Sequence, residues 1–490
     1  MTDKEFDLFL EETIDAPPPT ELSGEFTPWS RAMSRIVWGT GLTTLTLNFW
    51  NLDVILCAIG WMMLLLGYRA LRRENRWFRL GYGISWLRLV WFVVGFFLNG
   101  TIYAGEPVVR ELLNGTAYAM LVPGFLILLA LRNGIRAVQK KAGLPPHGGN
   151  GMLVWYLVML VLALMNYQGF LGWGVLIAQI VILRSLFRLS GELDEAGYAV
   201  SPAPVRMGDG TAKWIYMGSL VLALVIGSFF RTYPMDWQAH AVPEDAEVQT
   251  IRQELVELGF PEHILDDLSR EDILACKGAL QVVVDVEDHP FNDGREVQEQ
   301  TANWISIHTE YDQKELRVTG IAVELPGERE QWKIIHHFQW VINPGFRGTE
   351  AIQLWPAYRL TDGWTSAGEV SGQVLCDKEG QSLSASFYAL EHETYTRDTI
   401  FWGAQTSTDV FAEFSLPNNG ENHRGYVSYT IAELRDGCII DAWINYTHQT
   451  SWFQYPVITA KENNQTVGVK NTIFFRTIQD ALQFFPNNPE

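Results

Sequence analysis

The first half of the chain contains seven apolar segments of nearly membrane-spanning length. About 20 mostly apolar residues cross a bilayer as a helix, and slightly shorter segments suffice within a bundle. A buried soluble helix explains any one such segment, but seven in succession predict a polytopic α-helical membrane domain. The segments are Ile36–Trp50, Leu52–Tyr68, Leu80–Leu98, Ala117–Leu131, Met152–Tyr167, Phe170–Leu189 and Ala212–Phe230.

Basic residues in the loops between these segments predict their orientation, because loops rich in Lys and Arg remain cytoplasmic. Three loops on one side carry basic clusters, whereas the loops on the other side carry only Arg110. We therefore expect a multi-pass cell-membrane protein with a cytoplasmic amino terminus. Seven spans then place the chain after Arg231 outside the cytoplasm. The clusters are Arg69, Arg72, Arg73, Arg76 and Arg79; Arg132, Arg136, Lys140 and Lys141; and Arg184, Arg188, Arg206 and Lys213.

The two halves of the chain also differ in charge. Residues 1–230 hold 18 Lys and Arg against 16 Asp and Glu, whereas residues 231–490 hold 18 against 40. This contrast predicts different solvents for the halves, with the lipid bilayer as the partner of the first. An acidic exposed half repels polyphosphate, so we expect no nucleic acid partner. The amino terminus has no basic segment followed by an apolar core, so no secretory signal is predicted there.

Arg88 is the one charge well inside a predicted span. Such a charge is often functional, but it can also snorkel or pair with a backbone carbonyl, and we favour this structural interpretation. No row of acidic residues crosses the spans as a proton or cation relay requires. The sequence therefore disfavours transport as the protein's own activity.

The acidic half begins with a linker and a predicted group of short helices. Ile251, Leu255 and Leu258 have helical spacing, and Ser269 stands three residues before Asp272 as in a capping box. We expect a small helical spacer between the membrane helices and the outer domain. The predicted divisions are a cytoplasmic acidic tail (1–33), a transmembrane helical domain (34–230), a linker and spacer (231–279) and an outer domain (280–490).

From Leu280 onward the pattern is typical of short strands. Runs rich in β-branched and aromatic residues alternate with turn formers such as Pro326-Gly327 and Glu379-Gly380. Such a pattern with almost no intervening helix predicts an all-β antiparallel sandwich or jelly roll, located outside the cytoplasm. The last apolar run, TIQDALQFF at 477–485, is predicted to form a closing helix.

Familiar catalytic and metal-binding patterns are missing from the sequence of this outer domain. It has no GxSxG, HExxH, Walker or strand-linked GxGxxG sequence. His336 and His337 are adjacent, so on one strand they face opposite ways and cannot both chelate one ion. The acidic run 285–296 fails the EF-hand ligand pattern, although another kind of calcium loop stays open. We therefore predict no catalytic residue, no metal and no cofactor.

Four aromatic residues near predicted turns are the candidate ligand-binding residues. Flat aromatic faces at strand ends hold sugars or peptides in many β domains, although core packing explains aromatic residues more often. The expected function is an integral membrane protein of the cell envelope whose outward-facing domain binds or senses a glycan or peptide. Two alternatives stay open: a membrane-anchored enzyme acting on envelope glycan or lipid-linked substrate, and an accessory subunit of a transporter or secretion complex with a membrane protein partner. The four residues are Trp355, Tyr358, Trp364 and Trp452.

Overall fold

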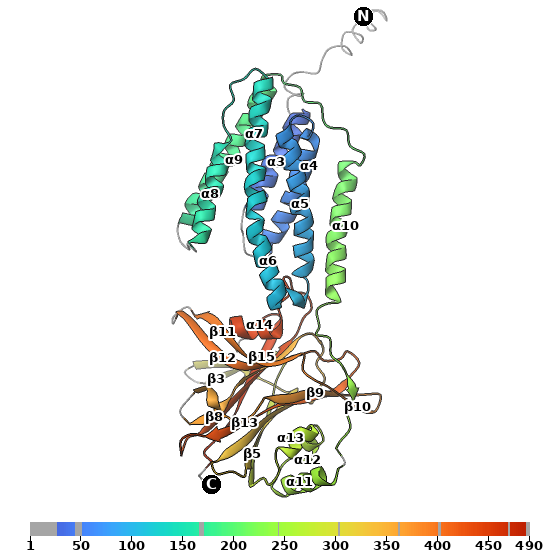
Figure 1. The fold of residues 1–490 in the computed structure, drawn as a ribbon, viewed down its shortest axis with the longest axis vertical. Helices are drawn as coiled ribbons and strands as arrows, with labels where there is room; N and C mark the ends of the chain where they lie inside the picture. The colour runs from blue at the N-terminus through green and yellow to red at the C-terminus, as the bar shows by residue number, and fades with distance from the viewer. Residues whose placement is uncertain are drawn as a thin grey trace, which may run out of the picture. The chain divides into compact units, whose positions relative to one another are not determined.

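The computed structural model describes two compact units (Figure 1). The helical unit comprises residues up to 99 together with 106–227, and the β unit comprises residues 100–105 together with 228–490. The short segment 100–105, which follows a membrane-type helix, thus belongs to the β unit. The residues described are 27–44, 51–165, 171–243, 245–301, 304–360, 363–399, 403–468 and 471–486.

Five helical stretches among the described residues are long and apolar enough to cross a bilayer. The membrane-type character of the first half is therefore confirmed, but the predicted count of seven spans is not. The five stretches are Leu52–Leu71, Arg76–Leu98, Pro107–Lys141, Gly172–Glu195 and Asp209–Ser228. The helices of this unit are α3 (Pro28–Thr44), α4 (Leu52–Leu71), α5 (Arg76–Leu98), α6 (Pro107–Ala119), α7 (Leu121–Lys141), α8 (Asn150–Leu164), α9 (Leu171–Glu195) and α10 (Asp209–Ser228).

The difference from seven spans has two sources. The predicted first and fifth spans extend into residues 45–50 and 166–170, which lie outside the described residues, so that α3 and α8 are described over 17 and 15 residues. The predicted fourth span, Ala117–Leu131, falls within the 35-residue apolar stretch formed by α6 and α7. Most of the predicted acidic tail, residues 1–26, also lies outside the described residues.

Glycines allow α3 and α4 to pack with their backbones close together. A Cβ added at Gly60 would lie 3.0 Å from the Gly39 carbonyl oxygen, and one at Gly67 would lie 2.8 Å from the Ala32 carbonyl oxygen. Small residues at such contacts are typical of helix pairs in membranes. Elsewhere in this unit, Arg88 donates a hydrogen bond to the Met120 carbonyl oxygen, which agrees with the structural interpretation of this charge.

The β unit is antiparallel throughout its recorded strand pairings and contains two large sheets. The prediction of an antiparallel all-β region is confirmed at this level. The eight-stranded sheet has the order β1-β10-β9-β13-β6-β5-β2 with β8 beside β13, the five-stranded sheet has the order β11-β12-β7-β14-β15, and β3 and β4 form a separate pair. The strands are β1 (Gln238–Ala239), β2 (Gln281–His289), β3 (Arg295–Thr301), β4 (Trp304–Glu310), β5 (Leu316–Leu325), β6 (Gln331–Trp340), β7 (Glu350–Trp355), β8 (Trp364–Ser366), β9 (Ser371–Lys378), β10 (Gln381–Ala385), β11 (Ala389–Thr399), β12 (Gly403–Phe414), β13 (Glu421–Glu433), β14 (Ile440–Gln449) and β15 (Phe475–Phe484).

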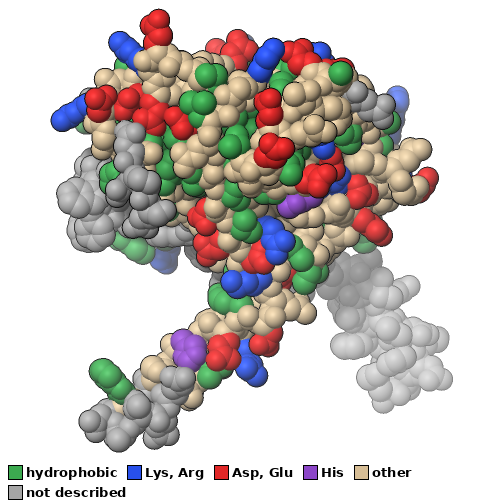
Figure 2. Space-filling view, turned by 90° about the horizontal axis from the view of Figure 1, so that it is seen from below, with side chains coloured by type: hydrophobic (Ala, Val, Ile, Leu, Met, Phe, Trp, Pro, Cys, Tyr) green, Lys and Arg blue, Asp and Glu red, His purple; other side chains and the backbone are tan. Residues whose placement is uncertain are grey.

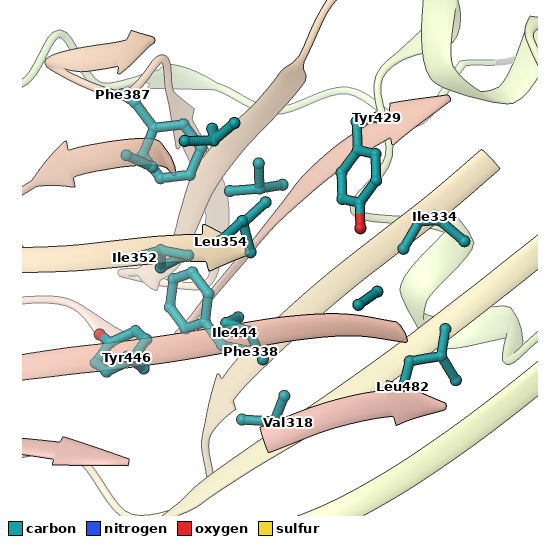
Figure 3. Packing of buried hydrophobic residues seen from close by; sticks show 14 of the residues in the cluster. Val318, Ile334, Phe338, Ile352, Leu354, Phe387, Tyr429, Ile444, Tyr446 and Leu482 are labelled. Atoms are coloured by element: carbon teal, nitrogen blue, oxygen red, sulfur yellow. The ribbon is translucent and has the colours of Figure 1, made fainter. Parts of the chain in front are cut away.

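One apolar core is shared by the two large sheets. Val318, Phe338 and Tyr429 reach it from the eight-stranded sheet, while Leu354 and Tyr446 reach it from the five-stranded sheet (Figure 3). Alternate residues of each strand point into this core, as the period of two along a strand requires. The opposite faces of both sheets are therefore available for other contacts.

The predicted closing helix at 477–485 is wrong, because these residues form most of strand β15. Ile478 and Leu482 carry its apolar signal, and a separation of four residues suits one face of a helix and one face of a strand equally well. Pairing of β15 with β14 along its whole length decides between the two. Both residues then point into the shared core.

Three short helices, α11 (Ala246–Glu257), α12 (Glu262–Leu265) and α13 (Arg270–Leu274), cover the other face of the eight-stranded sheet. Their apolar residues pack against Ile321, Ile335 and Tyr426, so the segment expected to be a spacer forms a layer of the β unit. Ser269 accepts a hydrogen bond from the Asp272 amide, as its predicted capping role requires. Carboxylate side chains are spread over the exposed surface of the β unit (Figure 2).

Candidate functional site

The structure places Trp355, Tyr358 and Trp364 near the start of β14 and separates Trp452 from them. Trp364 lies in β8 with 4% of its surface exposed, and its indole nitrogen donates to the Ile439 carbonyl oxygen at 3.0 Å, so its ring belongs to the core. Trp452 is 57% exposed and follows the end of β14 at Gln449. Trp355 pairs with Trp443 near the start of β14, about 20 Å from Gln449 at 3.4 Å per residue. The four predicted aromatic residues therefore do not all gather at one end of the sheets.

Tyr358 lies in the 3-10 turn η2 (Ala357–Leu360), directly after β7. Its hydroxyl is 2.8 Å from His392 Nε2, and its ring meets the Tyr429 ring edge-on at 5.7 Å. Burial raises the pKa of Tyr358 to about 12. These contacts tie η2 to the edge of the core, so Tyr358 positions the turn that follows Trp355.

Trp355 and Trp443 form a pair of indole rings on the outer face of the five-stranded sheet. Leu354 and Ile444, their neighbours along the strands, point into the shared core, so the two indoles point away from it. The ring centroids are 6.2 Å apart, and both residues are half-buried. The guanidinium carbon of Arg359 lies 4.6 Å from the centroid of the Trp355 ring. We call these three side chains the indole face.

A buried carboxylate, Asp409 of β12, anchors a polar network beside the indole face. Arg359 Nε lies 2.8 Å from Asp409 Oδ1, and the Asp409 side chain is 0% exposed. Asp409 Oδ2 accepts from Gln353 Nε2 at 2.6 Å and from the Tyr395 hydroxyl at 2.7 Å. Asn445 Nδ2 donates to Gln353 Oε1 at 2.9 Å. The network fixes Arg359 and thereby the ring beneath it.

Two buried polar atoms of this region have neither a hydrogen-bond partner nor an ion-pair partner among the described residues, unlike Asp409 Oδ1, which pairs with Arg359. They are Trp355 Nε1, a donor, and Asn445 Oδ1, an acceptor. Trp443 differs, because its indole nitrogen donates to Asp441 Oδ1 at 2.6 Å. Buried polar groups are nearly always satisfied by protein or by water, so these two atoms call for a polar partner.

Sequence reasoning missed Trp443 because it stands in the middle of a predicted strand instead of beside a turn. Trp443 and Asn445 are two residues apart, so both side chains lie on one face of the strand. This spacing is the signal in the sequence that could have identified Trp443. The pairing with Trp355 could not be found in this way, since β7 and β14 are far apart in the chain.

A second polar cluster lies beneath the three short helices. Asp272 accepts from Lys333 Nζ at 2.8 Å, from Ser371 Oγ at 2.6 Å and from the Tyr426 hydroxyl at 2.5 Å. Burial alone would raise the pKa of Asp272, but the Lys333 charge and these hydrogen bonds outweigh it and lower the pKa to about 2. Both partners of the ion pair have side chains 5% exposed, so we assign the cluster to holding the helices on the sheet.

The neighbouring carboxylate, Asp267, completes this attachment. It lies 2.9 Å from His337 Nε2 and 2.7 Å from Arg424 Nε. His336, in contrast, stacks near the Tyr429 ring in the shared core, so the two adjacent histidines face opposite ways as predicted. Burial lowers the pKa of His336 to about 4.

The helical unit contains a groove of about 800 Å³ between α4, α5, α10 and the segment before α10. Its walls are mostly apolar, and Arg72, Arg73 and Arg206 stand at one end. Arg72 donates to the Pro204 carbonyl oxygen at 2.6 Å, whereas Arg73 and Arg206 have no recorded counter-ion among the described residues. The apolar lining includes Leu65, Leu89, Val90, Val93, Val94, Ile215 and Tyr216.

Comparison with known proteins assigns no relative. No family model matches the chain, and no curated protein matches it in sequence. Among solved structures, a chain from the structure entitled "AvmM Catalyzes Macrocyclization in Alchivemycin A Biosynthesis" is 10% identical over 40% of this chain and 98% of its own, with a TM-score of 0.17. At that TM-score the likeness carries no argument about fold or function.

Proposed function

We propose that this chain is an integral membrane protein of the cell envelope whose β unit lies outside the cytoplasm and binds a glycan. Its amino terminus and basic loops would be cytoplasmic, and its two large sheets would form a sandwich around the core that they share. The single observation that carries the binding proposal is the indole face, Trp355 and Trp443 with Arg359.

A hydrogen bond within the β unit supports the topology. The Ile102 amide donates to the Phe230 carbonyl oxygen at 3.0 Å. Residue 102 follows α5 and residue 230 follows α10, so the chain leaves these two helices on one side of the membrane. An even number of crossings between them is required, and the α6–α7 stretch, α8, α9 and α10 supply four. The basic loops lie at the opposite ends of α5 and α10, as a cytoplasmic location requires.

The chemistry of the indole face suits a sugar ring. Aromatic rings offer a flat apolar surface to the C–H face of a sugar, and the Arg359 guanidinium beside the rings can donate hydrogen bonds to sugar hydroxyl groups. By analogy with aromatic pairs, each ring contributes roughly 1 kcal/mol. Two rings with a few hydrogen bonds would give weak, reversible binding, which suits sensing or tethering.

The test is a glycan screen with the full chain in detergent micelles, followed by affinity measurements on the best ligand. Trp443→Ala is expected to weaken binding about fivefold, the equivalent of roughly 1 kcal/mol. Trp452→Ala is the matched control, because Trp452 is exposed and distant from the indole face. If both variants weaken binding equally, or if neither weakens it, the proposed site is contradicted. Cleavage of a glycan by the parent protein would favour the membrane-anchored enzyme. A peptide that binds through Trp443 where no glycan does would replace the glycan as ligand.

We propose further that an anionic lipid binds in the groove of the helical unit. Its apolar walls suit acyl chains, and Arg73 and Arg206, for which the described residues supply no counter-ion, suit a phosphate headgroup. Native mass spectrometry should detect fewer retained phosphatidylglycerol molecules on Arg73→Gln/Arg206→Gln than on the parent. Arg79→Gln, which removes a basic residue outside the groove, should retain as many as the parent. Equal retention by all three proteins would remove the lipid from the proposal.

A further inference from the structure

Strand β2 ends with a pair of potential metal ligands on one face. Glu287 and His289 are two residues apart, so their side chains point the same way. They pair with Val318 and Leu316 of β5, and both of these residues point into the shared core. The acid–histidine pair thus borders the space between the two sheets.

The facing sheet supplies a third ligand, Asp480 of β15. Asp480 pairs with Ile444, a residue of the shared core, and so points inward from its own sheet. β15 packs closely on β5, because Leu482 Cβ would lie 3.0 Å from a Cβ added at Gly320. This close approach brings the Asp480 carboxylate across to β2.

The donor atoms have the spacing that one ion requires. One donor atom each from Glu287, His289 and Asp480 lies within 4.8 Å of the other two. His289 Nε2 is 3.5 Å from Asp480 Oδ2, which is long for a hydrogen bond. Two donors each about 2.1 Å from a tetrahedral ion lie about 3.4 Å apart. The separation therefore suits a shared metal better than a direct bond.

An independent observation at this position is an unsatisfied imidazole. His289 is only 9% exposed, and its Nε2 atom has no hydrogen-bond partner among the described residues. Buried polar atoms are rarely left in this state. His336, 1% exposed, faces the same core and pairs with Gly320 of β5, and neither of its ring nitrogens has a hydrogen-bond partner among the described residues.

The local charge also favours a cation. Two carboxylates converge here, and within the described residues neither Glu287 nor Asp480 has a recorded ion pair with Lys or Arg. The nearby Arg317 pairs instead with Asp288, which points to the opposite face of β2. Glu287 is exposed, so solvent reaches the group and water can complete the coordination.

We propose that Glu287, His289 and Asp480 bind one divalent transition-metal ion, with Zn²⁺ as the representative probe. One imidazole and two carboxylates match ligands that Zn²⁺ accepts, whereas the imidazole argues against Ca²⁺ or Mg²⁺. The ion would join the edge strand β2 of one sheet to the edge strand β15 of the other. The proposal is independent of the indole face, which lies on the outer side of the five-stranded sheet.

The experiment uses the untagged full chain in detergent, treated with a chelator and freed of it, because a polyhistidine tag would itself bind zinc. Titration calorimetry with Zn²⁺ should give one site per chain, and saturation should raise the unfolding temperature of the β unit. Asp480→Asn and Glu287→Gln should each weaken this binding at least about tenfold. Glu287→Gln changes an exposed residue, so it tests the site even if the Asp480 variant fails to fold.

The matched control is His308→Gln, which removes an exposed histidine lying 3.5 Å from Glu310. It should leave the affinity and the stoichiometry unchanged. Zn²⁺ binding that is unaffected by Glu287→Gln, or no saturable binding by the parent, overturns the proposal. Tighter binding of Ca²⁺ than of Zn²⁺ also overturns it, because the imidazole would then have no role as a ligand.

Discussion

The helical unit and the β unit handle polar groups in opposite ways. In the helical unit the interior charge Arg88 donates a hydrogen bond to a backbone carbonyl oxygen. Ion pairs of this unit, such as that of Arg69 with Asp209, lie near helix ends. In the β unit, carboxylates such as Asp272 and Asp409 are buried against cations from other elements, Lys333 of β6 and Arg359 of η2. The helical unit is thus organised by apolar segments that are continuous in sequence. The β unit is organised by pairs that only the fold brings together.

The strongest test of this contrast is to determine on which side of the membrane the basic loops and the end of the chain lie. A reporter active only outside the cytoplasm, fused after Glu490, should be active, and one fused after Lys141 should be silent. The reason is the basic-loop asymmetry together with the even number of crossings that we propose between α5 and the end of α10. Activity assays on both fusions check this all-or-none outcome. The reverse pattern would invert the assignment of both units.

Separation of the units gives a second large effect. Residues 229–490 expressed alone should be soluble and monodisperse with a β-dominated circular dichroism spectrum, because they contain both sheets and the helices that cover the eight-stranded sheet. A fragment beginning at residue 244 should be less stable. It loses β1 and the Tyr233 hydroxyl, which donates to Glu413 Oε2 at 2.5 Å. Aggregation of the longer fragment would mean that the β unit depends on the helical unit.

Removal of one buried charge should destabilise the β unit selectively. Lys333→Met leaves the Asp272 carboxylate buried without its cation, which costs about 3–5 kcal/mol of unfolding free energy. Lys333→Met/Asp272→Asn should recover part of this loss, and the exposed Lys277→Met should leave stability unchanged. Thermal unfolding followed by limited proteolysis identifies the affected unit. Equal stability of Lys333→Met and the parent would show that the buried pair does not hold the helices in place.

Acid should weaken the β unit through His423. Burial and the nearby Arg347 charge lower the pKa of His423 to about 4 from 6.5, so the folded state binds fewer protons than the unfolded state in that window. Stability therefore falls as the pH drops from about 6.5 to 4, by about 2 kcal/mol at pH 5 for this residue. His423→Leu should show a smaller loss between pH 7 and pH 5 in denaturant titrations. An identical loss in both proteins would assign the effect to other groups.

The smallest effect is expected where the helical unit packs tightly. Gly60→Ala places a methyl group 2.7 Å from Thr43 Cγ2 and 3.0 Å from the Gly39 carbonyl oxygen. The net loss should be about 1 kcal/mol, since overpacking outweighs the better helix propensity of alanine. Gly83→Ala in α5 is the control, because no atom lies within 4 Å of the added Cβ. Unfolding in detergent should rank the two variants, and a more stable Gly60→Ala would mean that α3 and α4 can move apart freely.

Local signals in the sequence were sufficient for much of the fold. One of the β-branched-rich runs after Leu280, LRVTGIAVEL at 316–325, forms β5, and Glu379-Gly380 forms the tight turn between β9 and β10 with both residues at positive φ. The error at β15 arose because the spacing of Ile478 and Leu482 fits a helix and a strand alike. Only the pairing of β15 with β14 resolves that ambiguity.

Candidate sites were less predictable, because their residues are distant in sequence. Trp355 was identified beside a turn, but its partner Trp443 is set by the register between β7 and β14. Glu287 and His289 stand within the acidic run that was considered as a calcium loop. Once these residues are assigned to a strand, their two-residue spacing places both side chains on one face. Asp480 joins this pair of ligands only because the two sheets pack against each other.

The membership of residues 100–105 in the β unit has a consequence for the order of events during synthesis. Ile102 packs with Tyr233 and Val457, although Val457 leaves the ribosome about 355 residues later. At 5–20 residues per second, this interval is roughly 20–70 s. The loop after α5 therefore meets Tyr233 about 130 residues later, but it waits for Val457 until nearly the whole chain has been made. Completion of the β unit must therefore follow the synthesis of α5 and α6, because its first segment, 100–105, contacts a residue that lies between β14 and the last strand, β15.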